Sequence, residues 1–273
     1  MNKEIFDKIN FPKKINAHEL YEFFKSKKLN NLNILSKERD RSVNEYFSEK
    51  EFKPELLDLY RLYKFITLNK RTTVMEFGAG YSTLIFNIAL NENRKKFFSE
   101  IKKLRRNNPF ELFTIDNDRA YIKKTEKKIN KYQNKYFLSK SKINYHYSEV
   151  EMVMHNNRIA TQYKTLPMCN PDFIYIDGPS QFGVKNKING ISTCHIDMMP
   201  MLCDVLKIEY FLTPGTIIVT DGRGANAKFI KDNLKRDWLY IYQEYFDQHI
   251  FYLNDQAIGP YNKLQLKFYK NKI

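Results

Sequence analysis

The sequence predicts an α/β protein built on a doubly wound, mostly parallel sheet of seven strands. Three observations predict this fold. Residues 74–86 have the pattern of a short apolar strand, a glycine turn and a helix. Three further apolar strands, separated by helical patterns, end at Asp116, Asp177 and Asp221. Alternating apolar and polar residues between positions 238 and 253 then predict a hairpin that completes the sheet.

The chain divides into three segments. Residues 1–70 are rich in lysine and aromatic residues at helical spacing, which predicts an N-terminal helical cap. Residues 71–253 contain the predicted strands and form the sheet domain. Residues 254–273 are predicted to be a C-terminal tail with a strand at 264–269. A chain of 273 residues suits one α/β domain with such extensions, so we expect no second independent domain.

Three connections between the strands carry further expectations. The basic run at 94–106 is expected to form an inserted helix or to continue the helix that follows the first strand, away from the ligand-binding edge of the sheet. Residues 150–170 are expected to form a loop and a helix. The connection at 180–200 is long and aperiodic. Loops of this length in compact domains are commonly functional, so we expect residues 180–197 to form a lid over the substrate.

Composition limits the classes of partner and compartment. The formal charge of +15 and the pI near 9.4 would suit nucleic acid or an anionic membrane, but lysine is abundant throughout, which favours a solvated basic surface. The three cysteines, Cys169, Cys194 and Cys203, form no disulfide or zinc pattern. The start of the chain lacks a signal peptide, and no segment approaches a membrane span. We therefore expect a cytoplasmic protein with no membrane partner, and a homo-oligomer is possible.

The glycine turn carries an acid two residues before its first glycine. Glu76, Gly78 and Gly80 make this pattern, and the helix opens at Tyr81 and Ser82. A tight backbone followed by a helix N-terminus presents N–H groups to a bound nucleotide. A threonine stands where the dinucleotide fingerprint has its third glycine, which disfavours NAD.

This acid-x-Gly-x-Gly pattern resembles motif I of the class I S-adenosylmethionine-dependent methyltransferases. Segments 113–116, 173–179 and 214–221 resemble the other landmarks of that family, in the same order. The resemblance implies a Rossmann-like sheet whose last strand is antiparallel, and it implies S-adenosylmethionine as cofactor. The positions that it assigns to cofactor binding are Glu76, Gly78, Gly80, Tyr81, Ser82, Asp116, Ser148 and Asp177.

Three of these positions receive individual roles. A fixed carboxylate at Asp116 can accept hydrogen bonds from both ribose hydroxyls. The resemblance implies that Ser148 contacts the adenine and that Asp177 lies beside the transferable methyl group. Alternatives remain for two of them, because Asp116 with Asp118 could cap the following helix and Ser148 could be a turn residue.

The end of the fourth strand, Ile-Asp-Gly, looks like that of small-molecule O-methyltransferases of the macrocin and catechol types. This implies O-methylation of a small hydroxylated acceptor, of the sugar or phenol type. Asp177 and Asp221 match two metal-binding positions of those enzymes, which makes Mg²⁺ a candidate. However, Ser180 and Gly222 replace the lysine and asparagine of the catechol type. Metal dependence and the general base therefore stay open, with Asp177 and His195 as candidate catalytic residues.

Two alternatives come from other functional classes. The net charge of +15 suits an RNA methyltransferase. Nucleic acid is therefore kept as an acceptor, although a small molecule is favoured over it. A non-catalytic partner subunit that keeps the cofactor fold is the second alternative.

Overall fold

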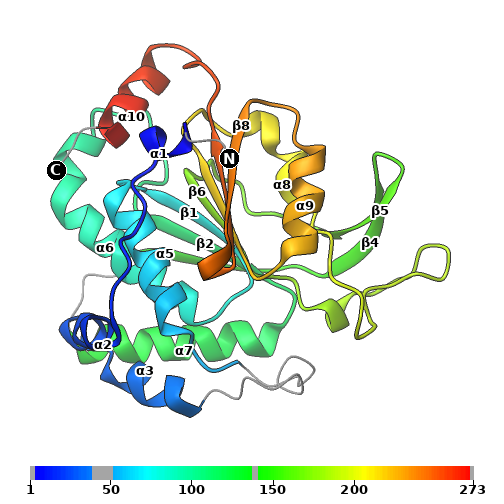
Figure 1. Ribbon diagram of the computed structural model, residues 1–273, viewed down its shortest axis with the longest axis horizontal. Helices are drawn as coiled ribbons and strands as arrows, with labels where there is room; N and C mark the ends of the chain where they lie inside the picture. Colours follow the sequence, from blue (N-terminus) through cyan, green and yellow to red (C-terminus); the bar gives the residue numbers. More distant parts are fainter. Residues whose placement is uncertain (1–3, 39–51, 137–140, 271–273) are drawn as a thin grey trace.

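Within residues 4–38, 52–136 and 141–270, which the computed structural model describes, a seven-stranded sheet has the order β3-β2-β1-β6-β7-β9-β8 (Figure 1). The strands are β1 (Thr73–Phe77), β2 (Glu111–Asp116), β3 (Ile143–Tyr147), β6 (Phe173–Ile176), β7 (Ile217–Asp221), β8 (Trp238–Gln243) and β9 (Gln248–Leu253). Neighbours from β3 to β7 pair in parallel, and β9 is antiparallel to both β7 and β8. The predicted doubly wound, mostly parallel sheet is confirmed.

Helices cover both faces of this sheet. One face carries α5 (Leu56–Leu68), α6 (Tyr81–Ile101) and α7 (Arg119–Lys135), and the other carries α8 (Asp204–Lys207) and α9 (Gly224–Asn233) (Figure 1). Consecutive residues of β1 point to opposite faces, so Val74 packs in the first core and Met75 in the second. Such strands are buried on both sides, which explains their continuous apolar sequences.

The N-terminal helices belong to the first of these cores. They are α1 (Ile5–Lys8), α2 (Ala17–Ser26) and α3 (Asn30–Leu35), followed by the 3₁₀ turn η1 (Ser36–Glu38). Ile5, Phe24 and Leu32 are buried in the same cluster as the sheet residues. The described part of the predicted cap therefore contains helices, which pack on the α5–α7 side, while residues 1–3 and 39–51 of it lie outside the described residues. None of the helices in the described part of the chain combines the length and apolar character that crossing a membrane requires.

The structure of residues 150–170 differs from the one that we expected. These residues form an antiparallel hairpin of β4 (Val150–His155) and β5 (Arg158–Tyr163), where we expected a loop and a helix. The turn consists of Asn156 and Asn157, which have φ angles of +49° and +60°. Asparagine tolerates this left-handed conformation, which two-residue hairpin turns require. The Asn-Asn pair was therefore the signal that the sequence prediction missed.

The C-terminal segment also differs from its predicted structure. The prediction of a strand at 264–269 was wrong, because this segment belongs to the helix α10 (Pro260–Lys270). Proline at the first helical position has a φ angle suited to a helix and loses no hydrogen bond there. Asn262, Gln265 and Tyr269 then recur at helical spacing on its buried face. The helix packs beside the start of β7, where Asn262 Nδ2 donates to the carbonyl of Pro214 at 3.1 Å.

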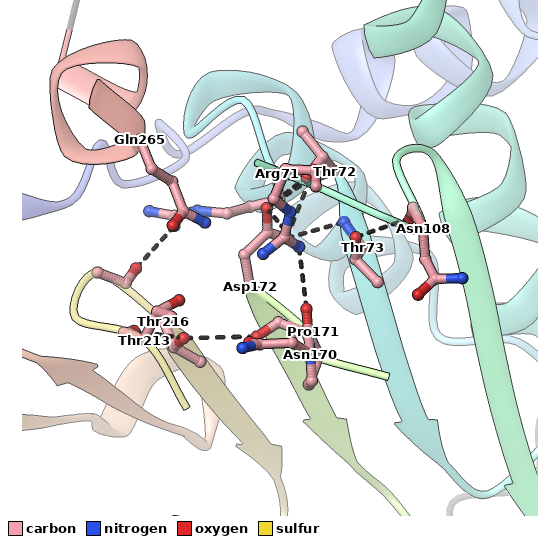
Figure 2. Close-up of polar contacts among 12 residues, drawn as sticks. Arg71, Thr72, Thr73, Asn108, Asn170, Pro171, Asp172, Thr213, Thr216 and Gln265 are labelled. Carbon is pink, nitrogen blue, oxygen red and sulfur yellow. Dashed lines mark hydrogen bonds and ion pairs between the residues drawn. The ribbon is translucent and has the colours of Figure 1, made fainter. Parts of the chain in front are cut away.

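A buried polar network fixes the amino ends of the strands (Figure 2). Asp172, which directly precedes β6, is fully buried and accepts hydrogen bonds from the backbone N–H groups of Thr72 and Thr73 at 2.9–3.0 Å. Its carboxylate also accepts from the hydroxyl of Tyr269 at 2.8 Å and lies 3.5 Å from the Arg106 guanidinium. One carboxylate therefore joins β1, β6 and the C-terminal helix.

We expect Asp172→Ala to lower the free energy of unfolding by about 3–5 kcal/mol, because it leaves several buried donors unpaired. Urea denaturation measures this change. The control is Asp232→Ala, which removes an exposed carboxylate 3.3 Å from Lys228 and should cost less than about 1 kcal/mol. Similar losses in the two variants would contradict a special role for Asp172.

Candidate functional site

The carboxyl ends of the parallel strands define the candidate site. After β1 the chain builds β2 and β3 on one side, and it then crosses back to place β6 on the other side of β1. The boundary between β1 and β6 is therefore the point where the winding direction reverses. Open α/β sheets bind ligands in the crevice outside the strand ends at such a switch point.

Two glycines meet at this switch point. Gly78 follows β1 with φ of +98°, and a Cβ atom there would lie 2.9 Å from the backbone nitrogen of Gly178, which follows β6. A Cβ atom on Gly178 would lie 2.7 Å from the nitrogen of Gly78. Only two residues without side chains allow the two loops to approach this closely. Gly80 is different, because its backbone is extended and a Cβ would come no nearer than 3.7 Å to its neighbours.

Glu76 braces the start of α6 from inside the protein. Its buried carboxylate accepts hydrogen bonds from the Ser82 hydroxyl at 2.5 Å and from the Thr83 hydroxyl at 2.7 Å. Burial raises the pKa of Glu76 to about 8. Glu76 and Ser82, both predicted to bind the cofactor, are thus engaged with each other. The neighbouring Tyr81 ring lies 3.6 Å from the Lys128 ammonium.

Asp116 ties the glycine turn to the end of β2. Its carboxylate accepts from the backbone N–H of Ala79 and from that of Asp118, both at 2.8 Å. Burial raises its pKa. The helix cap is Asp118, whose side chain accepts from the first-turn N–H groups of Ala120 and Tyr121. The capping alternative thus holds for Asp118, while Asp116 positions the turn beside the switch point.

Ser148 lies next to Asp116, as its predicted place after β3 requires. Its backbone N–H donates to the Asp116 carbonyl at 3.1 Å. Its buried hydroxyl accepts from the backbone N–H of Thr165 at 2.9 Å. This hydroxyl therefore joins the end of β3 to the segment that follows β5.

Asp177 is half exposed at the end of β6 and is held by an arginine that the sequence analysis did not select. The Arg223 guanidinium lies 3.5 Å from an Asp177 carboxylate oxygen. It also donates to the carbonyls of Asp177 at 2.5 Å and Pro179 at 3.2 Å. Arg223 follows Asp221 in an Asp-Gly-Arg-Gly sequence, so its position just after a strand end was the available signal.

Asp221 has a different environment from Asp177. Burial raises its pKa well above the usual range, and the neighbouring Asp58 and Asp177 raise it further. Among the residues that the structure describes, no group of three His, Cys, Asp or Glu side chains could hold a metal ion. A guanidinium already faces Asp177. Mg²⁺ at Asp177 and Asp221 stays an untested alternative, and no step below uses a cation.

His195 lies in the connection at 180–200, which is irregular except for the 3₁₀ turn η2 (Gln181–Gly183) and short bridges. Its side chain is 64% exposed, and its Nδ1 accepts from the backbone N–H of Asp197 at 3.1 Å. The connection is attached to the β4–β5 hairpin, where Lys185 N–H donates to the Val150 carbonyl at 3.0 Å. Whether this connection acts as a lid stays a prediction.

We expect Gly78→Ala to lower the free energy of unfolding by about 1–3 kcal/mol, because the new Cβ would meet the Gly178 backbone at a strained φ. Gly80→Ala is the matched control in the same turn, and its extended backbone should keep the loss below about 1 kcal/mol. Urea denaturation of both variants compares them. Equal losses would show that the contact between Gly78 and Gly178 does not constrain the turn.

Comparisons with known proteins identify similar structures only. No protein-family model matches the chain, and no curated protein matches it. The chain is similar to the O-methyltransferase TomG from Streptomyces achromogenes, which is involved in tomaymycin synthesis and was solved with SAM. The two share 10% sequence identity with a TM-score of 0.37, and the match covers 93% of this chain and 100% of that one. The chain is also similar to an O-methyltransferase from Bacillus cereus solved with SAH, at 12% identity and a TM-score of 0.37, covering 92% and 96%. Scores this low establish no correspondence between residues, so the roles proposed below rest on the geometry of this chain.

Proposed function

We propose that the protein is an S-adenosylmethionine-dependent methyltransferase that transfers the methyl group to oxygen on a small hydroxylated acceptor, of the sugar or phenol type. One observation carries the proposal. The Gly78 turn lies at the switch point of the sheet, and the Asp116 carboxylate one strand away is bonded to that turn. A tight turn with a carboxylate beside it suits a nucleoside whose ribose hydroxyls need a fixed acceptor.

The residues that would hold the cofactor follow from this arrangement. A carboxylate has about four acceptor sites, so Asp116 keeps capacity for ribose hydroxyls after bonding to the turn. Backbone at Gly78 and Gly80 would approach the ligand, with the start of α6 at Tyr81 beside it. Glu76, Ser82 and Ser148 support this site from behind, since their polar groups bond within the protein. When bound, S-adenosylmethionine supplies a methyl group activated on a sulfonium.

Asp177 is the residue that we propose to act on the acceptor. Methylation of a hydroxyl releases one proton, and a nearby general base accelerates such a step by about 10²–10⁴-fold. Asp177 is 53% exposed and follows directly from β6, and Arg223 holds its position. Histidine is a common general base, but the exposed ring of His195 lies on the long connection and its Nδ1 is engaged. Asp177 is therefore our preferred base, with His195 as the alternative.

We expect Asp116→Ala to weaken S-adenosylmethionine binding by about 1–3 kcal/mol in isothermal titration calorimetry, because the ribose acceptor is lost. Asp118→Ala is the matched control. It removes a helix cap two residues away, so it should cost about 1 kcal/mol of stability with little loss of affinity. Equal affinity of wild type and Asp116→Ala would remove Asp116 from the site. A folded wild type that binds no cofactor would favour the non-catalytic partner subunit.

We expect Asp177→Asn to reduce transfer of labelled methyl to hydroxylated sugars or phenols by about 10²-fold or more, and His195→Ala to reduce it far less. The same assay with EDTA tests for a metal, and we expect unchanged activity. A rate that is unchanged in Asp177→Asn but lost in His195→Ala would show that His195, and not Asp177, is the general base. Activity abolished by EDTA would contradict the metal-free site.

The net charge keeps RNA as a second candidate acceptor. RNA recognised through phosphates would show binding that falls with salt, with a logarithmic slope of about −0.7 per phosphate contacted. Methyl transfer to RNA with such a slope, and none to small acceptors, would show that RNA is the acceptor.

We also propose a cytoplasmic location, because Cys169, Cys194 and Cys203 are free thiols. Cell fractionation tests this, and recovery from an oxidising compartment would contradict it.

A further inference from the structure

Large apolar side chains are exposed at the amino edge of the sheet, opposite the proposed transfer site. Met168, just before β6, is 97% exposed. Tyr210 and Phe211, in the 3₁₀ turn η3 (Glu209–Phe211) before β7, are 74% and 78% exposed. Three more exposed apolar side chains, Phe98, Tyr261 and Leu264, lie on α6 and α10. These two helices pack together through Phe97 and Phe268. Scattered apolar residues are normal on a protein surface, but a group at one edge indicates an interaction site.

The turn that presents Tyr210 and Phe211 is firmly held. Glu209 is buried, and its carboxylate accepts from the backbone N–H groups of Lys235 and Arg236 and from the indole N–H of Trp238, each at 2.9 Å. The Phe211 carbonyl accepts from the Asn170 amide at 3.1 Å. The two aromatic side chains therefore point outward from a braced turn, which lowers the ordering cost of binding.

Contacts of three basic residues relate the positions of these apolar groups along the amino edge. Arg106 donates to the Asn170 carbonyl at 3.0 Å, which places it beside Phe211. Its neighbour Arg105 lies 5.6 Å from the Tyr261 ring, and Lys102 lies 4.6 Å from the Phe98 ring. We call this region the amino-edge surface. It consists of the six apolar side chains above and of three exposed basic residues, Lys102, Lys103 and Arg105.

We propose that the amino-edge surface docks the protein on an anionic lipid membrane. Apolar and aromatic side chains enter the interface between headgroups and acyl chains, while Lys and Arg attract anionic lipids. A second copy of the chain fits less well, because each copy carries a net charge of +15. Single-stranded nucleic acid stacks its bases on aromatic rings, and the aliphatic Met168 and Leu264 offer none.

This inference differs from the expectation of no membrane partner. That expectation rested on the absence of a stretch of about 20 apolar residues, which only a spanning helix needs. A surface that lies on the membrane needs no such stretch. In this orientation the carboxyl ends of the strands face away from the lipid, so Asp177 stays open to an acceptor from water.

Vesicle sedimentation tests the proposal on the full chain. Vesicles of phosphatidylcholine alone are compared with vesicles that also contain phosphatidylglycerol. One variant, Tyr210→Ser with Phe211→Ser, removes apolar groups, and its control is Ile34→Ser on α3, which also removes an exposed apolar side chain. The other variant, Lys102→Glu with Lys103→Glu, reverses two charges. Its control, Lys127→Glu with Lys131→Glu on α7, makes the same change in net charge elsewhere.

We expect wild type to bind the anionic vesicles and each amino-edge variant to bind them about tenfold or more weakly, with both controls within about twofold of wild type. Circular dichroism checks that every variant is folded. Equal binding to both kinds of vesicle, or equal loss in the α7 control, would overturn the proposal. Binding of single-stranded RNA that only the amino-edge variants lose would also overturn it. Asp116→Ala should bind vesicles normally, which separates this test from the proposed function.

Discussion

The alignment of β1 with β6 is the constraint on which the rest of the structure depends, and Asp172 maintains it at the amino end. The Asp172 carboxylate accepts both N–H groups that begin β1, and its own N–H donates to the Thr73 carbonyl at 3.0 Å. At the other end of the same pair, the Asp177 N–H donates to the Phe77 carbonyl at 2.9 Å. A slip of one residue would send each strand's side chains to the wrong core. It would also separate Gly78 from Gly178, on which the candidate site depends.

The two edges of the sheet have different physical characters for this reason. The amino edge is closed by buried ionic and hydrogen-bonded groups, with the Arg71 guanidinium 4.0 Å from the Tyr269 ring and bonded to the Gly215 carbonyl at 2.7 Å. Contacts of this kind restrict the relative movement of the elements that they join. The carboxyl edge ends in turns, where Asp177 reaches solvent. Rigidity at the amino edge therefore fixes the strand ends that form the candidate site at the carboxyl edge.

Three aspartates occupy equivalent strand ends but differ in what they can do. Asp116 is buried and bonded to the glycine turn, so it can position a ligand without leaving its place. Asp177 is half exposed and faces Arg223, so it can meet an acceptor. Asp221 is partly buried beside other carboxylates, which raises its pKa and favours its protonated form. The different roles that we propose for them therefore follow from their environments and not from residue type.

The sequence by itself predicted the strands of the seven-stranded sheet and the helices between them, because periodic apolar runs and glycine turns are local signals. It also placed Gly78, Asp116 and Asp177 at strand ends. It could not show that Glu76 and Ser82 bond to each other, that Asp118 is the helix cap, or that Arg223 faces Asp177. Those facts depend on contacts between segments far apart in the chain. The hairpin at Asn156 and the helix at Pro260 had local sequence signals that the prediction missed. The membrane-facing role that we propose for the amino edge rests instead on side chains that only the tertiary structure brings together.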